Sequence, residues 1–172
     1  MGFVFIKGED TRRILRDDWG NTPDAVKEVV GMMIPDTTSN VEYLDKAYLI
    51  SYRTPGHIND DRMSHFSFKK LLQAIQSSPD NSNSIVSWAW TPEYDMTAHR
   101  LSLPLMYVTN ETDTLFAGRQ LIFGKDGLVE IAPVSSLSDL QWVYDHADEI
   151  ANAITYNEGA AYSDYTGKPE NA

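Results

Sequence analysis

Apolar residues recur along the chain with two different spacings. A spacing of three and four residues predicts amphipathic helices, whereas alternation and short β-branched or aromatic runs predict strands. The helical spacing covers four segments, at residues 10–20, 22–35, 64–75 and 136–154. The strand pattern covers six segments, at residues 3–7, 47–53, 85–90, 101–109, 115–123 and 128–131.

The turn residues between these segments indicate how they connect. Gly124-Lys125-Asp126-Gly127 predicts a tight hairpin, because Asp-Gly supplies the positive φ angles that such a turn needs. The strands between residues 85 and 131 follow one another with short connections, which favours antiparallel pairing. We therefore expect a single α+β domain over residues 1–158, with an antiparallel sheet of five or six strands and three or four helices packed on it. Residues 159–172 lack an apolar period and are predicted to form a mobile C-terminal tail.

Acidic residues are concentrated in the last part of the chain. The 172 residues carry a net charge of −11, and residues 104–172 hold eleven acids against three bases. No Lys or Arg occurs between Lys125 and Lys168. This charge repels nucleic-acid phosphates and anionic lipids, so we expect no direct binding to nucleic acid or membrane. It attracts basic protein surfaces and speeds encounter with them.

Several kinds of chemistry lack the residues that they need. The chain has no cysteine, which excludes disulfides, thiolate metal ligands and a cysteine nucleophile. Phosphate-binding glycine motifs and hydrolase motifs are also missing, so no cofactor is expected and a non-enzymatic role is favoured. No apolar run reaches the length of a membrane span, and the first residues do not form a signal peptide. The expected compartment is therefore the cytoplasm.

The helix predicted near the C-terminus carries the clearest candidate surface. Four acidic residues, Asp139, Asp145, Asp148 and Glu149, precede it or lie on the side away from its apolar face. Asp145 and Glu149 are like charges four residues apart, which costs a few tenths of a kcal/mol in a helix. Such a local cost is compatible with a surface that binds something positive, and equally with a face that only keeps the protein in solution.

The leading interpretation is an acidic, non-enzymatic binding protein that docks on a basic protein surface. Inhibitors, immunity proteins and nucleic-acid mimics work in this way, because their carboxylates occupy sites that normally hold phosphates. The expected partner is a basic protein, such as one that binds nucleic acid. The partner's identity and the oligomeric state stay open.

Two alternative sites and a third class of function compete with this interpretation. A ligand-binding platform for a flat molecule such as a nucleotide would use Trp88, Trp90, Tyr94 and Arg100. A divalent-metal site, with a metal-dependent enzyme built around it, would use His57, Asp60, Asp61 and His65. A structural or assembly protein is the third class.

Overall fold

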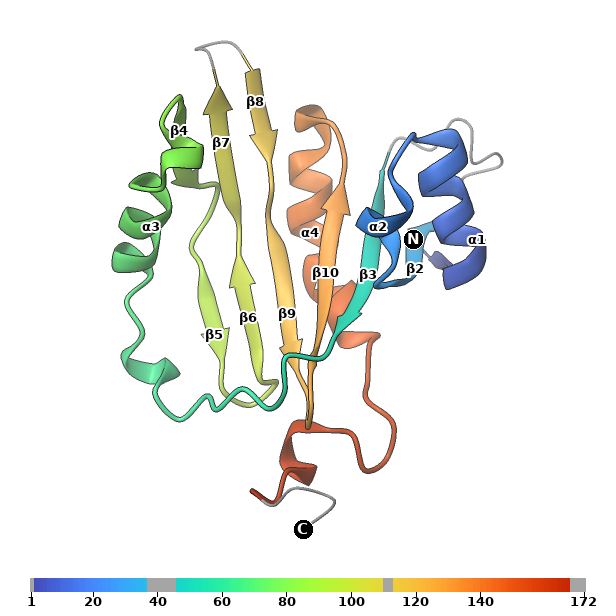
Figure 1. The fold of residues 1–172 in the computed structure, drawn as a ribbon, viewed down its shortest axis with the longest axis vertical. Helices are drawn as coiled ribbons and strands as arrows, with labels where there is room; N and C mark the ends of the chain where they lie inside the picture. Colours follow the sequence, from blue (N-terminus) through green and yellow to red (C-terminus); the bar gives the residue numbers. More distant parts are fainter. Residues whose placement is uncertain (1, 37–45, 110–112, 168–172) are drawn as a thin grey trace.

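The chain folds around two antiparallel sheets. The computed structural model describes residues 2–36, 46–109 and 113–167. The larger sheet has seven strands in the order β1-β2-β3-β10-β9-β6-β5, and the smaller one has the order β4-β7-β8 (Figure 1). The strands are β1 (Phe3–Lys7), β2 (Val29–Pro35), β3 (Ala47–Arg53), β4 (Ser84–Trp88), β5 (Glu93–Asp95), β6 (Arg100–Leu103), β7 (Leu105–Thr109), β8 (Asp113–Phe116), β9 (Arg119–Phe123) and β10 (Leu128–Val134).

Four α-helices accompany the strands in the described part of the chain. They are α1 (Gly8–Arg13), which continues as a wider π-helical turn over Ile14–Asp18, α2 (Pro23–Val26), α3 (Phe68–Gln76) and α4 (Leu140–Asn152). Single 3₁₀ turns occur at Met63–His65, Pro79–Asn81, Leu137–Asp139 and Tyr162–Asp164. Over these described residues, none of the helices combines the length and apolar character needed to cross a membrane.

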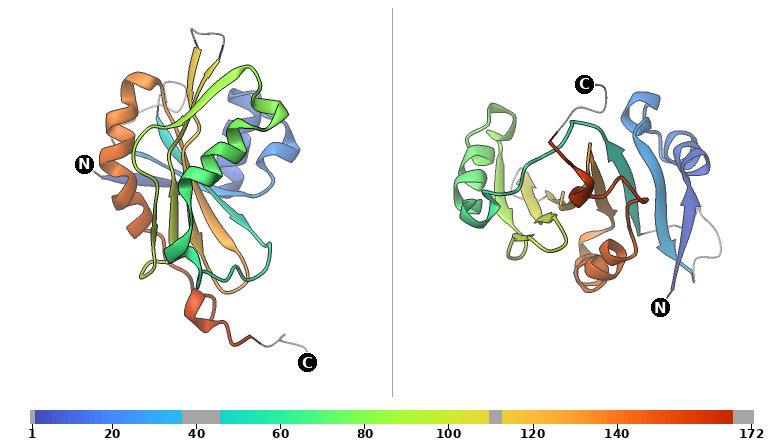
Figure 2. Two further views of the ribbon diagram at one scale, coloured as in Figure 1. Left: turned by 90° about the vertical axis from the view of Figure 1, so that its left-hand side faces the viewer. Right: turned by 90° about the horizontal axis from the view of Figure 1, so that it is seen from below.

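Helices cover both faces of the seven-stranded sheet. Successive strand residues point to opposite faces, so Ile122 and Phe123 of β9 contact different layers. Ile122 belongs to the core that α4 closes with Val143 and Ile150. Phe123 belongs to the core on the other face, which includes Phe68 of α3. Figure 2 shows α3 and α4 on opposite sides of the sheet accordingly. The α+β class and the antiparallel sheet are thus confirmed, with more strands than predicted.

The helix predicted over residues 22–35 is wrong for most of its length. Thr22 caps a single helical turn through its side chain, which accepts from the backbone N–H of Ala25. From Val29 the chain becomes β2, between β1 and β3. Most of β2 is buried, so its residues are apolar almost without interruption and match a helical spacing as well as a strand.

Two predicted strands are each divided between the two sheets. The segment 101–109 breaks at Pro104 into β6 of the larger sheet and β7 of the smaller one. The segment 115–123 breaks at Ala117–Gly118 into β8 and β9. A Cβ at Gly118 would lie 2.2 Å from the ring of Phe116, so a larger residue at this break would force that ring to move. The break places the Phe116 ring beside α4, at the edge of a cleft described below.

Candidate functional site

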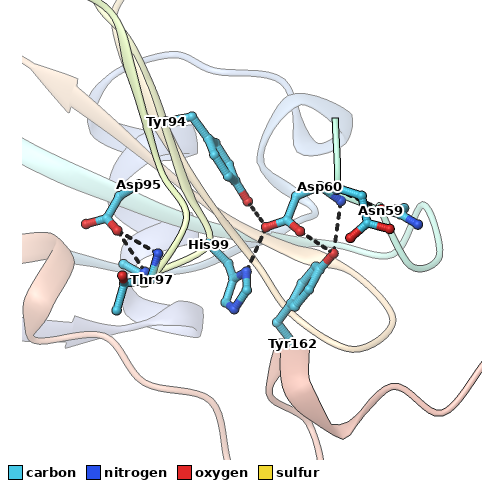
Figure 3. Close-up of polar contacts among 9 residues, drawn as sticks. Asn59, Asp60, Tyr94, Asp95, Thr97, His99 and Tyr162 are labelled. Atoms are coloured by element: carbon cyan, nitrogen blue, oxygen red, sulfur yellow. Dashed lines mark hydrogen bonds and ion pairs between the residues drawn. The ribbon is translucent and has the colours of Figure 1, made fainter. Parts of the chain in front are cut away.

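A buried carboxylate joins three distant segments of the chain. Asp60, only 3% exposed, lies in the loop between β3 and α3. Its Oδ2 accepts hydrogen bonds from the Tyr94 hydroxyl and from Nδ1 of His99, the latter at 2.7 Å. Its Oδ1 accepts from the Tyr162 hydroxyl at 2.8 Å, and that hydroxyl in turn accepts from the Asp60 N–H at 2.9 Å (Figure 3). We refer to these four residues as the Asp60 cluster.

The β5–β6 hairpin positions two members of this cluster. Tyr94 lies in β5, and His99 ends the turn that leads to β6. Within the turn, the Asp95 carboxylate accepts from the backbone N–H groups of Thr97 and Ala98 (Figure 3). His99 then adopts φ +51°, a left-handed conformation that non-glycine residues rarely take. This conformation directs the imidazole to the Asp60 carboxylate.

The charge state of Asp60 follows from its hydrogen bonds. Burial raises the pKa of this carboxyl, but the bonds from Tyr94, His99 and Tyr162 outweigh burial, and the net shift is downward. Burial and the bond to Asp60 both raise the pKa of Tyr94. At neutral pH the cluster therefore holds an ionised Asp60 surrounded by donors, with a neutral phenol at Tyr94.

The residues predicted as a metal site are not brought together. Asp60 contacts His99 instead of the predicted histidines. Nδ1 of His57 lies 2.9 Å from the Lys125 carbonyl oxygen, and His65 is exposed on the Met63–His65 turn. Asp61 is exposed beside Asp60. Across the described ranges, no three His, Asp or Glu side chains are grouped so as to hold a metal ion.

The predicted aromatic platform is also dispersed. Trp88 packs edge-on against Phe68 of α3, and the Tyr94 hydroxyl is bonded to Asp60. Arg100 faces the last turns of α4, where its guanidinium lies 3.2 Å from Oδ1 of Asn152 and 3.6 Å from Asp148. Of the four, Trp90 alone lines the cleft beside α4.

This cleft has a volume of about 440 Å³ and lies between α4 and the outer strands of the large sheet. Its floor includes Gln120 and Ser102, and its aromatic wall consists of Trp90, Phe116 and Tyr144. Trp90 stacks on Phe116 with ring centroids 5.1 Å apart and meets Tyr144 edge-on at 5.2 Å. The charged side chains that line the cleft are Glu93, Arg119, Asp145 and Asp148.

One row of paired residues runs across the sheet beneath α4 and into the cleft. Strand register places Ile131 opposite Gln120, Gln120 opposite Ser102 and Ser102 opposite Glu93. The row therefore changes from an apolar side chain under the helix to polar and then acidic side chains beyond it. The amide oxygen of Gln120 is buried and has no hydrogen-bond partner among the residues that the structure describes.

Three of the predicted acidic residues form an exposed surface on α4. We call Asp145, Asp148 and Glu149 the acidic face; all three are exposed, while Val143 and Ile150 are buried as predicted. Asp148 approaches Arg100 at 3.6 Å. Asp139 does not belong to this surface, because it precedes α4, is three-quarters buried and pairs with Lys46 at 3.6 Å.

Sequence reasoning missed His99 and Tyr162 in the Asp60 cluster, and Gln120 in the cleft. His99 and Tyr162 lie 39 and 102 residues from Asp60 along the chain, so no local spacing relates them. The residue type gave a weak signal for Tyr162, since an aromatic residue in a polar C-terminal segment is available for docking. Gln120 gave none, because one glutamine in a strand is an ordinary surface residue.

These features define a class: an α+β protein whose larger antiparallel sheet lies between helices, with an acidic cleft beside α4 and a buried carboxylate cluster on the opposite face of the same sheet edge. The family model described as "Protein of unknown function (DUF2167)" matches residues 1–171, so the chain belongs to this family. A search of the curated proteins gives no match.

Proposed function

We propose that this protein is a non-enzymatic binding protein that docks on a basic protein surface. The proposal rests chiefly on the cleft beside α4, because it combines an aromatic wall with carboxylates at its edge. A volume of about 440 Å³ is within the range of ligand sites and exceeds what one long side chain needs. The acidic face of α4 adjoins this cleft through Asp145 and Asp148.

The lining of the cleft suits a cationic group rich in hydrogen-bond donors. Gln120, Ser102 and Glu93 place an amide oxygen, a hydroxyl and a carboxylate in one cross-strand row. A guanidinium group offers five N–H donors and no acceptor, so it complements such a row better than a neutral or anionic group does. The arginine side chain of a basic partner is therefore the ligand that we propose for the cleft.

The aromatic wall supports the same ligand. Tyr144 is 54% exposed, and its ring meets Trp90 edge-on. A cation within about 6 Å of a Trp or Tyr ring is attracted by the π electrons, and arginine forms such contacts more often than lysine. The exposed aromatic surface thus offers apolar contact and cation attraction at one place.

The charges around the cleft leave it acidic. Arg119 approaches Glu130 at 3.4 Å, and Arg100 approaches Asp148 at 3.6 Å. Within the described ranges, Glu93, Asp145 and Glu149 have no ion-pair partner. Their field attracts a basic surface over roughly the screening length of the solution, about 10 Å at 0.1 M salt. The same field disfavours a nucleotide, which was the alternative ligand for this region.

Titration with short peptides tests this function directly. Acetylated tetra-arginine, tetra-lysine and tetra-glutamate peptides are added to the full chain, and tryptophan fluorescence and calorimetry report binding. We expect tetra-arginine to bind most tightly, tetra-lysine more weakly, and tetra-glutamate not at all. Binding should weaken steeply as salt is raised, because it depends on charge.

Two sets of variants separate local from overall charge. Glu93→Gln, Asp145→Asn and Glu149→Gln together remove three carboxylates at the cleft and the acidic face. Asp18→Asn, Asp80→Asn and Asp126→Asn remove three exposed carboxylates elsewhere and serve as the matched control. Only the first set should weaken peptide binding, by about tenfold or more. Equal effects of the two sets, or no binding of tetra-arginine at low salt, would overturn the proposal.

A further inference from the structure

A basic surface lies on the side of the large sheet opposite to α4. Arg62 precedes the Met63–His65 turn, and Lys69 and Lys70 lie in the first turn of α3. We call Arg62, Lys69 and Lys70 the basic patch; all three residues are exposed. No Asp or Glu occurs over residues 62–79, so the patch interrupts an otherwise acidic chain.

The side chains of the basic patch have no ion-pair partner among the described residues. By contrast, seven other Lys and Arg side chains in the described ranges pair with carboxylates. Lys69 and Lys70 lie near the N-terminus of α3, where the helix dipole disfavours positive charge. Stabilisation of α3 therefore does not account for these two cations. The patch also adjoins an aromatic side chain, because Phe66 follows the Met63–His65 turn and is 40% exposed.

The basic patch complements the cleft beside α4. Glu93 and Asp145 line the cleft without an ion-pair partner in the described ranges, and the buried amide oxygen of Gln120 has no donor there. The guanidinium of Arg62 offers five N–H donors, which these oxygens can accept. An exposed ring such as that of Phe66 would add apolar contact with the aromatic wall of the cleft.

The distribution of charge favours one relative orientation of two copies of this chain. Each copy carries a net charge of −11, so two acidic faces brought together repel each other. The basic patch of one copy and the acidic face of another attract each other, and at 0.1 M salt charges farther away than about 10 Å are largely screened. A symmetric contact of α4 with α4 is therefore disfavoured, and a contact between two different surfaces is favoured.

We propose that the basic partner of the cleft is a second copy of this chain, which inserts Arg62 into the cleft and sets Lys69 and Lys70 against the acidic face. The proposal rests on the function proposed above, because it names the partner of the same cleft. The large sheet separates α3 from α4, so the patch cannot reach the cleft of its own chain (Figure 2). Each copy offers a patch on one side and a cleft on the other. The copies therefore join head to tail, as open chains or rings.

Two neutralised variants test the two surfaces separately. The cleft variant removes three carboxylates: Glu93→Gln, Asp145→Asn and Glu149→Gln. The patch variant removes three cations: Arg62→Gln, Lys69→Gln and Lys70→Gln. Sedimentation velocity at up to about 1 mM protein should show wild-type assemblies that grow with concentration, and each variant alone should associate about tenfold or more weakly. An equal mixture of the two variants should form a dimer and nothing larger, because one variant keeps the patch and the other keeps the cleft.

Two controls separate this contact from a general effect of charge. Arg13→Gln, Arg16→Gln and Lys27→Gln together remove three exposed cations elsewhere and give the same net charge as the patch variant. This control should assemble like the wild type. Arg62→Lys keeps the charge but loses the planar guanidinium, so it should weaken assembly by about tenfold.

Three results would overturn the proposal: a wild-type protein that stays monomeric, a patch variant that assembles like the wild type, or a mixture of variants that forms no dimer. A monomeric wild type that still binds tetra-arginine leaves the proposed function standing and shows that only the identity of the partner is wrong. Failure of tetra-arginine to bind, together with assembly that the cleft variant retains, would overturn both.

Discussion

Two regions of this molecule use carboxylates in opposite ways. Asp60 is 3% exposed and satisfied by three side-chain donors, whereas the side chain of Asp148 on the acidic face is 80% exposed. The first carboxylate fixes chain segments that lie up to 102 residues apart. The second contributes mainly to the electric field outside the protein.

The difference shows that burial, more than residue type, decides what an acidic side chain does. A buried carboxylate has lost its hydration, so each donor around it is needed and its removal leaves unpaired polar groups. An exposed carboxylate keeps its hydration, and its neutralisation changes stability little. Mutations in the Asp60 cluster should therefore change stability, and mutations in the acidic face should change binding.

Replacing Asp60 should have the largest effect on stability. Asp60→Ala removes the common acceptor of Tyr94, His99 and Tyr162. We expect a loss of about 3 kcal/mol or more in the free energy of unfolding, measured by denaturant titration. Asp61→Ala is the control, because the neighbouring side chain is exposed and should change stability by less than about 0.5 kcal/mol. Similar losses in the two variants would show that the Asp60 cluster is not specifically stabilising.

The segment beyond Glu158 offers a second test of the same cluster. The sequence predicts that this segment is mobile, and that remains a prediction. In the structure, Tyr162 donates to the Asp60 side chain and accepts from its N–H, and Lys125 N–H donates to the Ala160 carbonyl. From these contacts we expect Tyr162→Phe to lower stability by about 1–3 kcal/mol.

Tyr165→Phe is the matched control for this prediction, because phenylalanine keeps the ring that stacks on His57. Removal of residues 159–172 should destabilise the protein at least as much as Tyr162→Phe, as measured by thermal unfolding. If the truncated chain instead melts within a few degrees of the full chain, the segment is a mobile tail as the sequence predicts.

The Asp60 cluster should also make stability depend on pH at both extremes. The pKa of Asp60 is lower in the folded state, so its contribution is present above the unfolded pKa, about 4, and is lost as pH falls through the folded pKa. The pKa of Tyr94 is raised by burial and by its bond to Asp60, so stability falls as pH rises above about 10, where the unfolded phenol ionises. Tyr156, whose pKa burial raises to about 12, adds to the alkaline loss. Thermal unfolding measured over a range of pH checks the loss of stability at low pH and at high pH. In Asp60→Ala the loss at low pH should be smaller.

Neutralising the acidic face should have the smallest effect on stability. Asp145→Asn with Glu149→Gln relieves a like-charge contact four residues apart and should stabilise the protein by a few tenths of a kcal/mol. Asp148 is retained in this variant because it approaches Arg100 at 3.6 Å. Association with a basic peptide should slow and lose part of its salt dependence, as stopped-flow fluorescence would show. Unchanged association rates at low salt would assign these carboxylates to solubility alone.

Several elements could be predicted because their signals are local. The strand Ala47–Arg53 matches its prediction residue for residue, and α3 follows the capping Ser67, whose side chain accepts from Lys70 N–H. The period of α4 correctly places Val143 and Ile150 inside. Local signals gave a wrong prediction for β2. Most of this strand is buried, so it lacks the polar residues that alternate with apolar ones in a half-exposed strand. Local signals also failed at Trp90–Asp95, where β5 is too short to show a period.

The sequence by itself determined the α+β class, the antiparallel pairing of the strands and the concentration of acid toward the C-terminus. Only the tertiary structure decided which carboxylate became structural and which stayed at the surface. Asp60 and Asp61 are adjacent and chemically identical, yet one is buried among donors and the other is exposed. The physical reason is that the β5–β6 hairpin and the Tyr162–Asp164 turn supply those donors. The positions of both elements depend on strand register and on contacts between residues that are 39 and 102 positions apart in the chain. No local sequence pattern encodes such contacts.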